Sequence, residues 1–191
     1  MNHAIRLICL ALCLGLAAPA LAAPAYYVLE PEKSTVGFQT DFGPDTITGS
    51  MPILKASLSL DFAAPANSSV DVTLDVAHAE ASFPFATQAM RGPKVLDAAA
   101  NPTIRFVSTR VRPAGDGATM DGNITIRGVT KPITLNAAIY QQKGSAAGDL
   151  SHLTLRLTGT IHRSDFGAVG WSDMVGDEVR LDIVARVQRA D

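Results

Sequence analysis

The segment Gly122-Asn-Ile-Thr-Ile-Arg-Gly-Val-Thr-Lys-Pro-Ile-Thr-Leu-Asn-Ala-Ala-Ile139 alternates apolar and polar residues on both sides of a turn. In a β-strand every second side chain lies on the same face, so this pattern predicts an antiparallel hairpin with one face turned away from water. The residues that share this face are Ile124, Ile126, Ile133 and Leu135. Such a face packs either on other side chains alone or also on a ligand.

The same two-residue period recurs along the chain, with Gly-, Pro-, Asn- and Asp-rich turns between the alternating runs. It predicts an all-β chain of eight antiparallel strands. Eight strands with one dry face can close into a barrel without exposed edges, which is the fold we predict; a sandwich of two sheets is the alternative. The predicted strands cover approximately 34–41, 45–62 (bent near Pro52), 69–78, 103–111, 119–127, 132–141, 150–162 and 178–188.

The apolar positions within each run predict the inward face of the barrel. The alternate positions are mostly Thr, Asp, Arg, Ser and Asn, as expected for a face in contact with water. The predicted inward residues are Val36, Phe38, Leu58, Leu60, Phe62, Val70, Val72, Leu74, Val76, Ile104, Phe106, Ile124, Ile126, Ile133, Leu135, Ile139, Leu153, Leu155, Leu157, Ile161, Val179, Leu181 and Ile183.

Residues 79–100 form the one long interruption of the strand pattern. Phe83-Pro-Phe85 and the Ala-rich run Leu96-Asp-Ala-Ala-Ala100 favour short helical turns over a strand. We predict a short helical insertion that covers one end of the barrel.

Residues 1–22 have the pattern of a secretory signal peptide. Arg6 precedes an apolar run from Leu7 to Leu16, and Ala20-Leu21-Ala22 is a small-x-small cleavage signal. The apolar run is shorter than the roughly 20 residues that a membrane-spanning helix needs. We therefore predict a removed signal peptide at 1–22, one mature domain at 23–191 and a periplasmic location.

Both cysteines, Cys9 and Cys13, fall in the predicted signal peptide, so the mature chain is expected to have no disulfide and no cysteine ligand. Export without disulfides fits a bacterial periplasm. A lipoprotein modified at Cys13 is the alternative, but Leu12 is a poor residue just before a modified cysteine.

The charged and titratable residues point to no reaction and no nucleic acid. The chain has 16 Lys and Arg against 18 Asp and Glu and no basic run, whereas a nucleic-acid binder concentrates positive charge on one face. The histidines of the mature chain, His78, His152 and His162, are not spaced as metal ligands. No Gly-x-Ser-x-Gly motif and no convincing acid–base pair occurs. We predict no metal, no cofactor and no enzymatic activity.

Two local segments allow a functional and a structural interpretation. Arg127-Gly-Val-Thr-Lys-Pro132 is expected to be a hairpin turn with solvated cations, and a clasp for a pyrophosphate is the alternative. Trp171, the sole tryptophan, lies in a Gly-flanked loop between the last two strands. Its indole either caps the core or closes over a ligand at the mouth of the barrel.

Several longer segments are together similar to one known family. They are Tyr27-Val-Leu-Glu-Pro-Glu-Lys-Ser-Thr-Val-Gly-Phe38, Leu96-Asp-Ala-Ala-Ala-Asn-Pro-Thr-Ile-Arg-Phe-Val-Ser-Thr109, Asp121-Gly-Asn-Ile-Thr-Ile-Arg-Gly-Val-Thr-Lys-Pro-Ile-Thr-Leu135, and Ile161-His-Arg-Ser-Asp-Phe-Gly167 followed by Val175-Gly-Asp-Glu-Val179. In this order and spacing they resemble the YceI-like family of exported, lipocalin-like barrels that bind polyisoprenoid lipids. The chain departs from the family at Lys33, where a histidine is common, and after Arg91, where a further histidine often follows.

The resemblance implies an apolar tunnel inside the barrel that holds a prenyl chain, and often a homodimer. We therefore predict a protein that binds, sequesters or carries a polyisoprenoid lipid, as a prenyl chain, a quinone or a prenyl phosphate. One alternative is an adaptor for a membrane redox protein, with a barrel filled by its own side chains; another is an enzyme acting on an isoprenoid lipid. The residues predicted to contact the ligand are Phe38, Leu60, Leu74, Phe106, Ile124, Ile126, Leu135, Leu155, Phe166, Trp171, Leu181 and Ile183.

Overall fold

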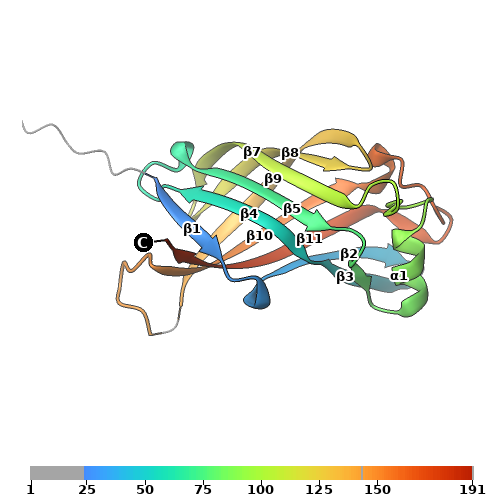
Figure 1. The fold of residues 1–191 in the computed structure, drawn as a ribbon, viewed down its shortest axis with the longest axis horizontal. Helices are drawn as coiled ribbons and strands as arrows, with labels where there is room; N and C mark the ends of the chain where they lie inside the picture. Colours follow the sequence, from blue (N-terminus) through green and yellow to red (C-terminus); the bar gives the residue numbers. More distant parts are fainter. Residues whose placement is uncertain (1–23, 143, 191) are drawn as a thin grey trace, which may run out of the picture.

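The structure is a computed structural model that describes residues 24–142 and 144–190. Within these residues it consists of antiparallel strands, one α-helix and three short 3₁₀ helices (Figure 1). The strands are β1 (Ala25–Leu29), β2 (Thr35–Phe42), β3 (Asp45–Met51), β4 (Ile53–Leu60), β5 (Ser69–Asp75), β6 (Glu80–Ala81), β7 (Thr103–Ala114), β8 (Gly117–Ile126), β9 (Val129–Gln141), β10 (His152–His162) and β11 (Val175–Arg189). The helices are α1 (Pro84–Arg91), η1 (Pro31–Lys33), η2 (Pro65–Asn67) and η3 (Arg163–Phe166).

Eight of the strands close a ring in the order β1-β4-β5-β7-β8-β9-β10-β11, because β1 pairs with both β4 and β11. Tyr27 of β1 lies opposite Leu58 on one side and opposite Arg189 on the other. The predicted eight-stranded barrel is confirmed, and the sandwich alternative is wrong.

The β2–β3 hairpin extends the wall of this ring toward the end that carries α1. β2 pairs with β11 between Val175 and Val184, along the same edge that β1 uses between Val187 and Arg189. β3 then continues into β4 across Pro52, which has no N–H to donate to a neighbouring strand. The predicted single strand at 45–62 is therefore two strands, and the break falls at the predicted bend.

The sequence pattern does not predict β1, although β1 closes the ring. Both faces of this strand are apolar, so no alternation marks it. Tyr26 and Val28 point outward and are 70% and 61% exposed, whereas Tyr27 between them is 5% exposed.

A β-bulge in β7 also corrects the predicted inward face. The register between β7 and β8 shifts between Ser108 and Arg110, and Val111 then lies opposite Met120. An extra residue reverses which positions of a strand point inward. Val111 is consequently buried in the core, although it did not belong to the predicted inward set. Met120, also outside that set, is buried because it shares the inner face of β8 with Ile124 and Ile126.

The helical insertion lies at one end of the barrel, and β1 lies at the other (Figure 1). Pro84 begins α1, where a residue without an N–H costs no helical hydrogen bond. Ala86 of this helix is buried, and Ala89 and Met90 face the barrel interior. The predicted short helix within 79–100 is thus confirmed.

The predicted signal peptide at 1–22 lies outside the described residues. In the part of the chain that the structure describes, no helix is both long and apolar enough to cross a lipid bilayer.

Candidate functional site

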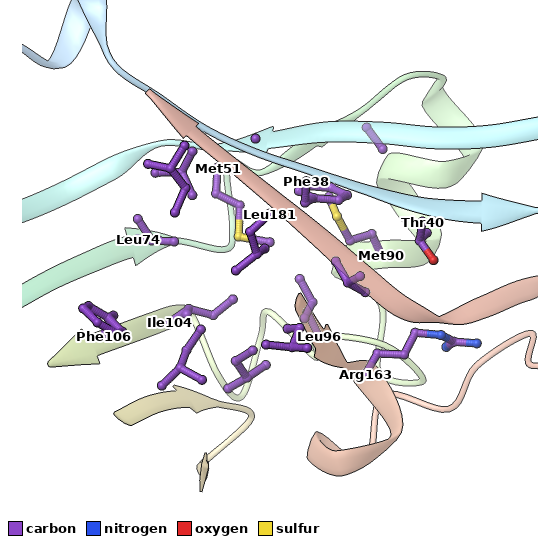
Figure 2. Close-up of a pocket in the computed structure, with 18 of the residues that line it drawn as sticks. Phe38, Thr40, Met51, Leu74, Met90, Leu96, Ile104, Phe106, Arg163 and Leu181 are labelled. Atoms are coloured by element: carbon purple, nitrogen blue, oxygen red, sulfur yellow. The ribbon is translucent and has the colours of Figure 1, made fainter. Parts of the chain in front are cut away.

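The interior of the barrel contains a cavity of about 290 Å³ that reaches the end covered by α1. This volume lies near the lower end of the range for small-molecule sites. Figure 2 shows side chains from several strands, among them Leu74, Phe106 and Leu181, converging on the same space.

The cavity is elongated along the barrel. On β10 its lining extends from Leu155 to Ile161, a distance of about 20 Å along the strand at about 3.3 Å per residue. With strands tilted by about 40°, this corresponds to about 15 Å along the barrel axis. Phe85, Trp171 and Met174 lengthen the cavity further at its open end, so its shape suits a chain better than a compact ligand.

Every residue predicted to contact a ligand lines this cavity. These residues are Phe38, Leu60, Leu74, Phe106, Ile124, Ile126, Leu135, Leu155, Phe166, Trp171, Leu181 and Ile183. Alternation places the ones on strands on the inner face, and η3 and the loop after it place Phe166 and Trp171. Their contact with a ligand stays a prediction.

The end of the barrel next to β1 is filled by side chains. The rings of Tyr27 and Phe62 pack edge to face with centroids 5.8 Å apart, and Leu153 and Val187 are fully buried beside them. The Tyr27 hydroxyl donates a hydrogen bond of 2.9 Å to the carbonyl of Leu150. Burial raises the pKa of the Tyr27 phenol, so this group stays neutral. The cavity is thus closed at this end.

Two glycines make room for the aromatic rings of the cavity wall. A Cβ atom at Gly49 would overlap the ring of Phe38, and one at Gly122 would overlap the ring of Phe106. Gly49 is the direct cross-strand partner of Phe38. Each ring therefore covers a glycine of the neighbouring strand instead of extending across the lumen, which leaves the lumen open.

Thr40 and Arg163 are the polar side chains of the lining, and both are buried. The Thr40 hydroxyl donates to the carbonyl of Glu178 at 2.9 Å. Arg163 donates to four backbone carbonyls, two in the loop after η3 and two at the start of β11. Its Nη1 donates to Ala168 at 2.6 Å and to Gly170 at 2.8 Å, its Nε to Gly176 at 2.9 Å and its Nη2 to Val175 at 2.8 Å.

The stem of Arg163 faces the cavity, and its nitrogen end turns away from the apolar side chains (Figure 2). Burial lowers the pKa of Arg163, and the nearby Asp177 carboxylate opposes this effect. An arginine nevertheless stays charged in proteins. The guanidinium holds the loop between η3 and β11, and the wall itself remains apolar.

The mouth of the cavity lies between α1 and this loop. The rings of Phe85 and Trp171 pack edge to face with centroids 6.3 Å apart, and Lys94 Nζ lies 5.7 Å from the centroid of the Trp171 ring. The Gly170 amide donates to the Lys94 carbonyl at 2.9 Å. Trp171 has a φ of 52°, which is rare for a bulky residue. These contacts fasten the helical segment to the loop.

The β8–β9 turn fastens the same segment from another side. Arg127 and Gly128 both have positive φ, 51° and 73°, as a type I′ turn requires. The predicted hairpin turn is confirmed, but the expectation that its cations are solvated is wrong for Arg127. Its Nη1 donates to the carbonyls of Pro93 at 2.9 Å and Val95 at 2.7 Å.

The sequence pattern missed several lining residues. Thr40 and Arg163 are polar, so a search for apolar alternation passes over them. Phe85 and Met174 lie in the helix and in a loop, where strand alternation gives no signal. Arg163 falls within residues 161–167, one of the segments that resemble the YceI-like family, and this resemblance is the sequence signal that points to it.

His78, His152 and His162 lie apart from the cavity lining. His78 Nδ1 lies 2.6 Å from Asp75 Oδ2 in an exposed pair, and His152 Nδ1 lies 3.1 Å from Ser151 Oγ. In residues 24–142 and 144–190, no three His, Cys, Asp or Glu side chains gather in a way that could hold a metal ion.

The profile of the YceI-like domain family matches residues 27–187. The chain belongs to the YceI-like family. Its barrel is similar to the crystal structure of BcnA from Burkholderia cenocepacia, with a TM-score of 0.75 and 24% identity, covering 83% of this chain and 99% of that one. It is also similar to the YCEI protein of Campylobacter jejuni, with a TM-score of 0.61 and 22% identity over 74% and 85% of the two chains. At such identities the likeness concerns the fold alone.

Curated relatives agree with the family. A UPF0312 protein of Pseudomonas aeruginosa is 33% identical over 116 residues, 58% of either chain. A UPF0312 protein of Serratia proteamaculans is 27% identical over 148 residues, 78% of this chain and 77% of its own. The match thus spans little more than half the length of the Pseudomonas relative. A YceI-like barrel with an internal cavity has room for a small ligand.

Proposed function

We propose that this YceI-like protein is exported to the periplasm, where its lumen binds and carries a polyisoprenoid lipid. The observation that carries this proposal is the chemistry of the lining. In the described residues, the lining contains no Asp, Glu, His, Lys, Cys or Tyr, and both of its polar side chains are hydrogen-bonded to backbone carbonyls.

An apolar chain is the ligand that such a wall stabilises. Each methylene moved out of water contributes about 0.8 kcal/mol, so a chain of several isoprene units binds with few polar contacts. A polar head group inside the lumen would lose its hydrogen bonds to water without replacement, at a cost of about 1–3 kcal/mol or more. We therefore expect the head group, a quinone ring or a phosphate, to lie at the mouth. The resemblance to the family supports an isoprenoid chain in particular.

The alternative functions find less support. An adaptor with a filled barrel is disfavoured because the barrel contains a cavity. An enzyme acting on the lipid would need an acid or base within reach of the bound chain, and Thr40 and Arg163 are both engaged with backbone carbonyls. The homodimer and the membrane redox partner stay predictions.

Native mass spectrometry of the gently purified mature protein tests the proposal. The wild type is expected to retain a lipid adduct that extraction removes and added polyprenol restores. Leu181→Trp places a larger side chain in the lumen, beside Phe38 and Gly159 on the neighbouring strands. We expect this variant to retain at least about tenfold less lipid, with an overpacking cost of about 1–3 kcal/mol in stability.

The matched control is Thr160→Trp, which adds the same side chain at an exposed position of β10. It should retain lipid like the wild type. Circular dichroism and urea unfolding verify that both variants fold. A folded Leu181→Trp protein with an undiminished adduct, or a delipidated wild type that takes up no polyprenol, would refute the proposal.

A further inference from the structure

Exposed apolar side chains gather at the mouth of the lumen. Phe85 on α1 is 63% exposed, and Val169 and Met174 in the loop between η3 and β11 are 58% and 47% exposed. Trp171 lies between Val169 and Met174 in the chain, and its ring packs against that of Phe85. We call Phe85, Val169, Trp171 and Met174 the apolar rim. Apolar side chains exposed together in this way mark an interaction surface more often than single ones do.

The apolar rim is continuous with the lumen. Phe85, Trp171 and Met174 line the cavity as well as facing solvent, whereas Val169 faces solvent only. A chain that leaves the lumen at this end therefore passes directly onto the rim.

The backbone holds Val169 in its outward position. Arg163 Nη1 donates to the carbonyls of Ala168 and Gly170, the residues on either side of Val169. The Gly170 amide donates to the Lys94 carbonyl. Trp171 keeps a left-handed backbone conformation, which is unfavourable for a bulky residue and persists only where the surroundings impose it. The exposure of Val169 thus belongs to a fixed loop conformation.

We propose that the apolar rim docks on the surface of a lipid bilayer, so that an apolar chain moves between the membrane and the lumen without crossing water. The inference rests on the proposed function, because the chain to be moved is the lipid in the lumen. Transfer through water would expose the apolar surface of the whole lipid chain, which is unfavourable at every methylene. An indole with a lysine beside it, as Trp171 and Lys94 are arranged, is typical of side chains at the membrane–water interface.

Docking through the apolar rim depends on apolar insertion more than on charge. The chain carries an excess of acidic residues, so anionic lipids give it no general attraction. Binding to uncharged bilayers should therefore persist when salt is raised, because salt screens charges and leaves apolar burial intact.

Vesicle flotation with the mature protein and phosphatidylcholine vesicles tests the inference. Val169→Asp changes an exposed side chain outside the cavity lining, and Val28→Asp is its matched control, with 61% exposure at the other end of the barrel. Loss of one inserted valine and addition of a charge should weaken the partition of Val169→Asp into vesicles by about tenfold or more. Val28→Asp should bind like the wild type. Vesicles of brominated phosphatidylcholine should quench Trp171 in the wild type and in the control.

Several outcomes would overturn docking on a bilayer. Wild-type protein that does not float, equal binding by the two Asp variants, or unquenched Trp171 would each do so. So would a dimer in sedimentation velocity that Val169→Asp alone dissociates, because the rim would then bind a second copy. Native mass spectrometry of the same samples separates this inference from the proposed function. A lipid adduct without vesicle binding refutes the docking alone, and vesicle binding without an adduct refutes the carrier.

Discussion

Arg163→Met is the substitution that tests most directly how the mouth of the lumen is held. Methionine keeps an aliphatic stem against the cavity but has neither charge nor donors. It removes the four hydrogen bonds to the carbonyls of Ala168, Gly170, Val175 and Gly176. Among the described residues, one other side chain donates to one of these carbonyls: the Thr40 hydroxyl lies 3.1 Å from the Gly176 oxygen.

The cost follows from the burial of Arg163, which is 7% exposed. A hydrogen bond to a charged group contributes about 1.5–3 kcal/mol, but the four values do not add, since water reaches part of the loop and the guanidinium no longer has to be desolvated. Each buried carbonyl left without a donor costs about 1–3 kcal/mol, and water that enters the loop offsets part of this, so the net loss is about 3–5 kcal/mol. We expect a loss in this range, a large part of a typical unfolding free energy of about 5–15 kcal/mol.

Urea unfolding followed by circular dichroism measures this loss, and hydrogen exchange locates it. The amides of Ala168, Gly170 and Val175 donate to backbone carbonyls that depend on the same loop conformation, so their exchange should accelerate most. Arg163→Lys keeps the charge but offers donors from one atom only, and it should give an intermediate loss. A loss below about 1 kcal/mol with unchanged loop exchange would refute the reasoning, because the loop would then hold its conformation without the guanidinium.

Two further substitutions test other contacts. Arg127→Asn keeps the type I′ turn, because this turn favours Asn-Gly, and it removes only the hydrogen bonds to the carbonyls of Pro93 and Val95. Hydrogen exchange of the amides at 92–96 should accelerate. The free energy of unfolding should change by less than about 1 kcal/mol. Unchanged exchange there would show that the segment is held by other contacts. Hydrogen bonds from Arg156 lower the pKa of Asp182 in the folded protein. The pair therefore stabilises the fold fully at pH values above the pKa of Asp in the unfolded chain, about 3.9. This stabilisation is lost as the pH falls through the lower pKa of Asp182 in the folded protein. In Asp182→Asn the unfolding free energy should therefore decline less in acid than in the wild type, by up to about 1 kcal/mol because both side chains are exposed; identical acid profiles would show that the pair contributes nothing.

Local alternation is enough to predict most of the lumen wall. Phe38, Leu74 and Leu181 are apolar residues that alternate with Gly or polar residues along their strands. A strand places every second side chain on the same face, whichever strands it pairs with. The same pattern fails at β1, where Tyr26 and Val28 are apolar on the outer face. It also fails after the bulge in β7, where the extra residue turns Val111 inward. Both failures come from features that depend on pairing with another strand.

The mouth of the lumen depends on contacts between segments that are distant in the sequence. Phe85 meets Trp171, Arg127 holds the carbonyls of Pro93 and Val95, and Gly170 binds the backbone of Lys94. No periodicity encodes these pairs, because each joins a helix or a turn to a loop, and their side chains follow no repeating direction. The sequence alone therefore predicts the strands and their inner face, because these depend on short-range alternation. It also indicates the YceI-like family, because the family's motifs occur in the expected order. Only the tertiary structure decides how β1 closes the barrel, which carbonyls Arg163 binds and which end of the cavity is open. The physical reason is that contacts between segments distant in the sequence set the positions of these residues.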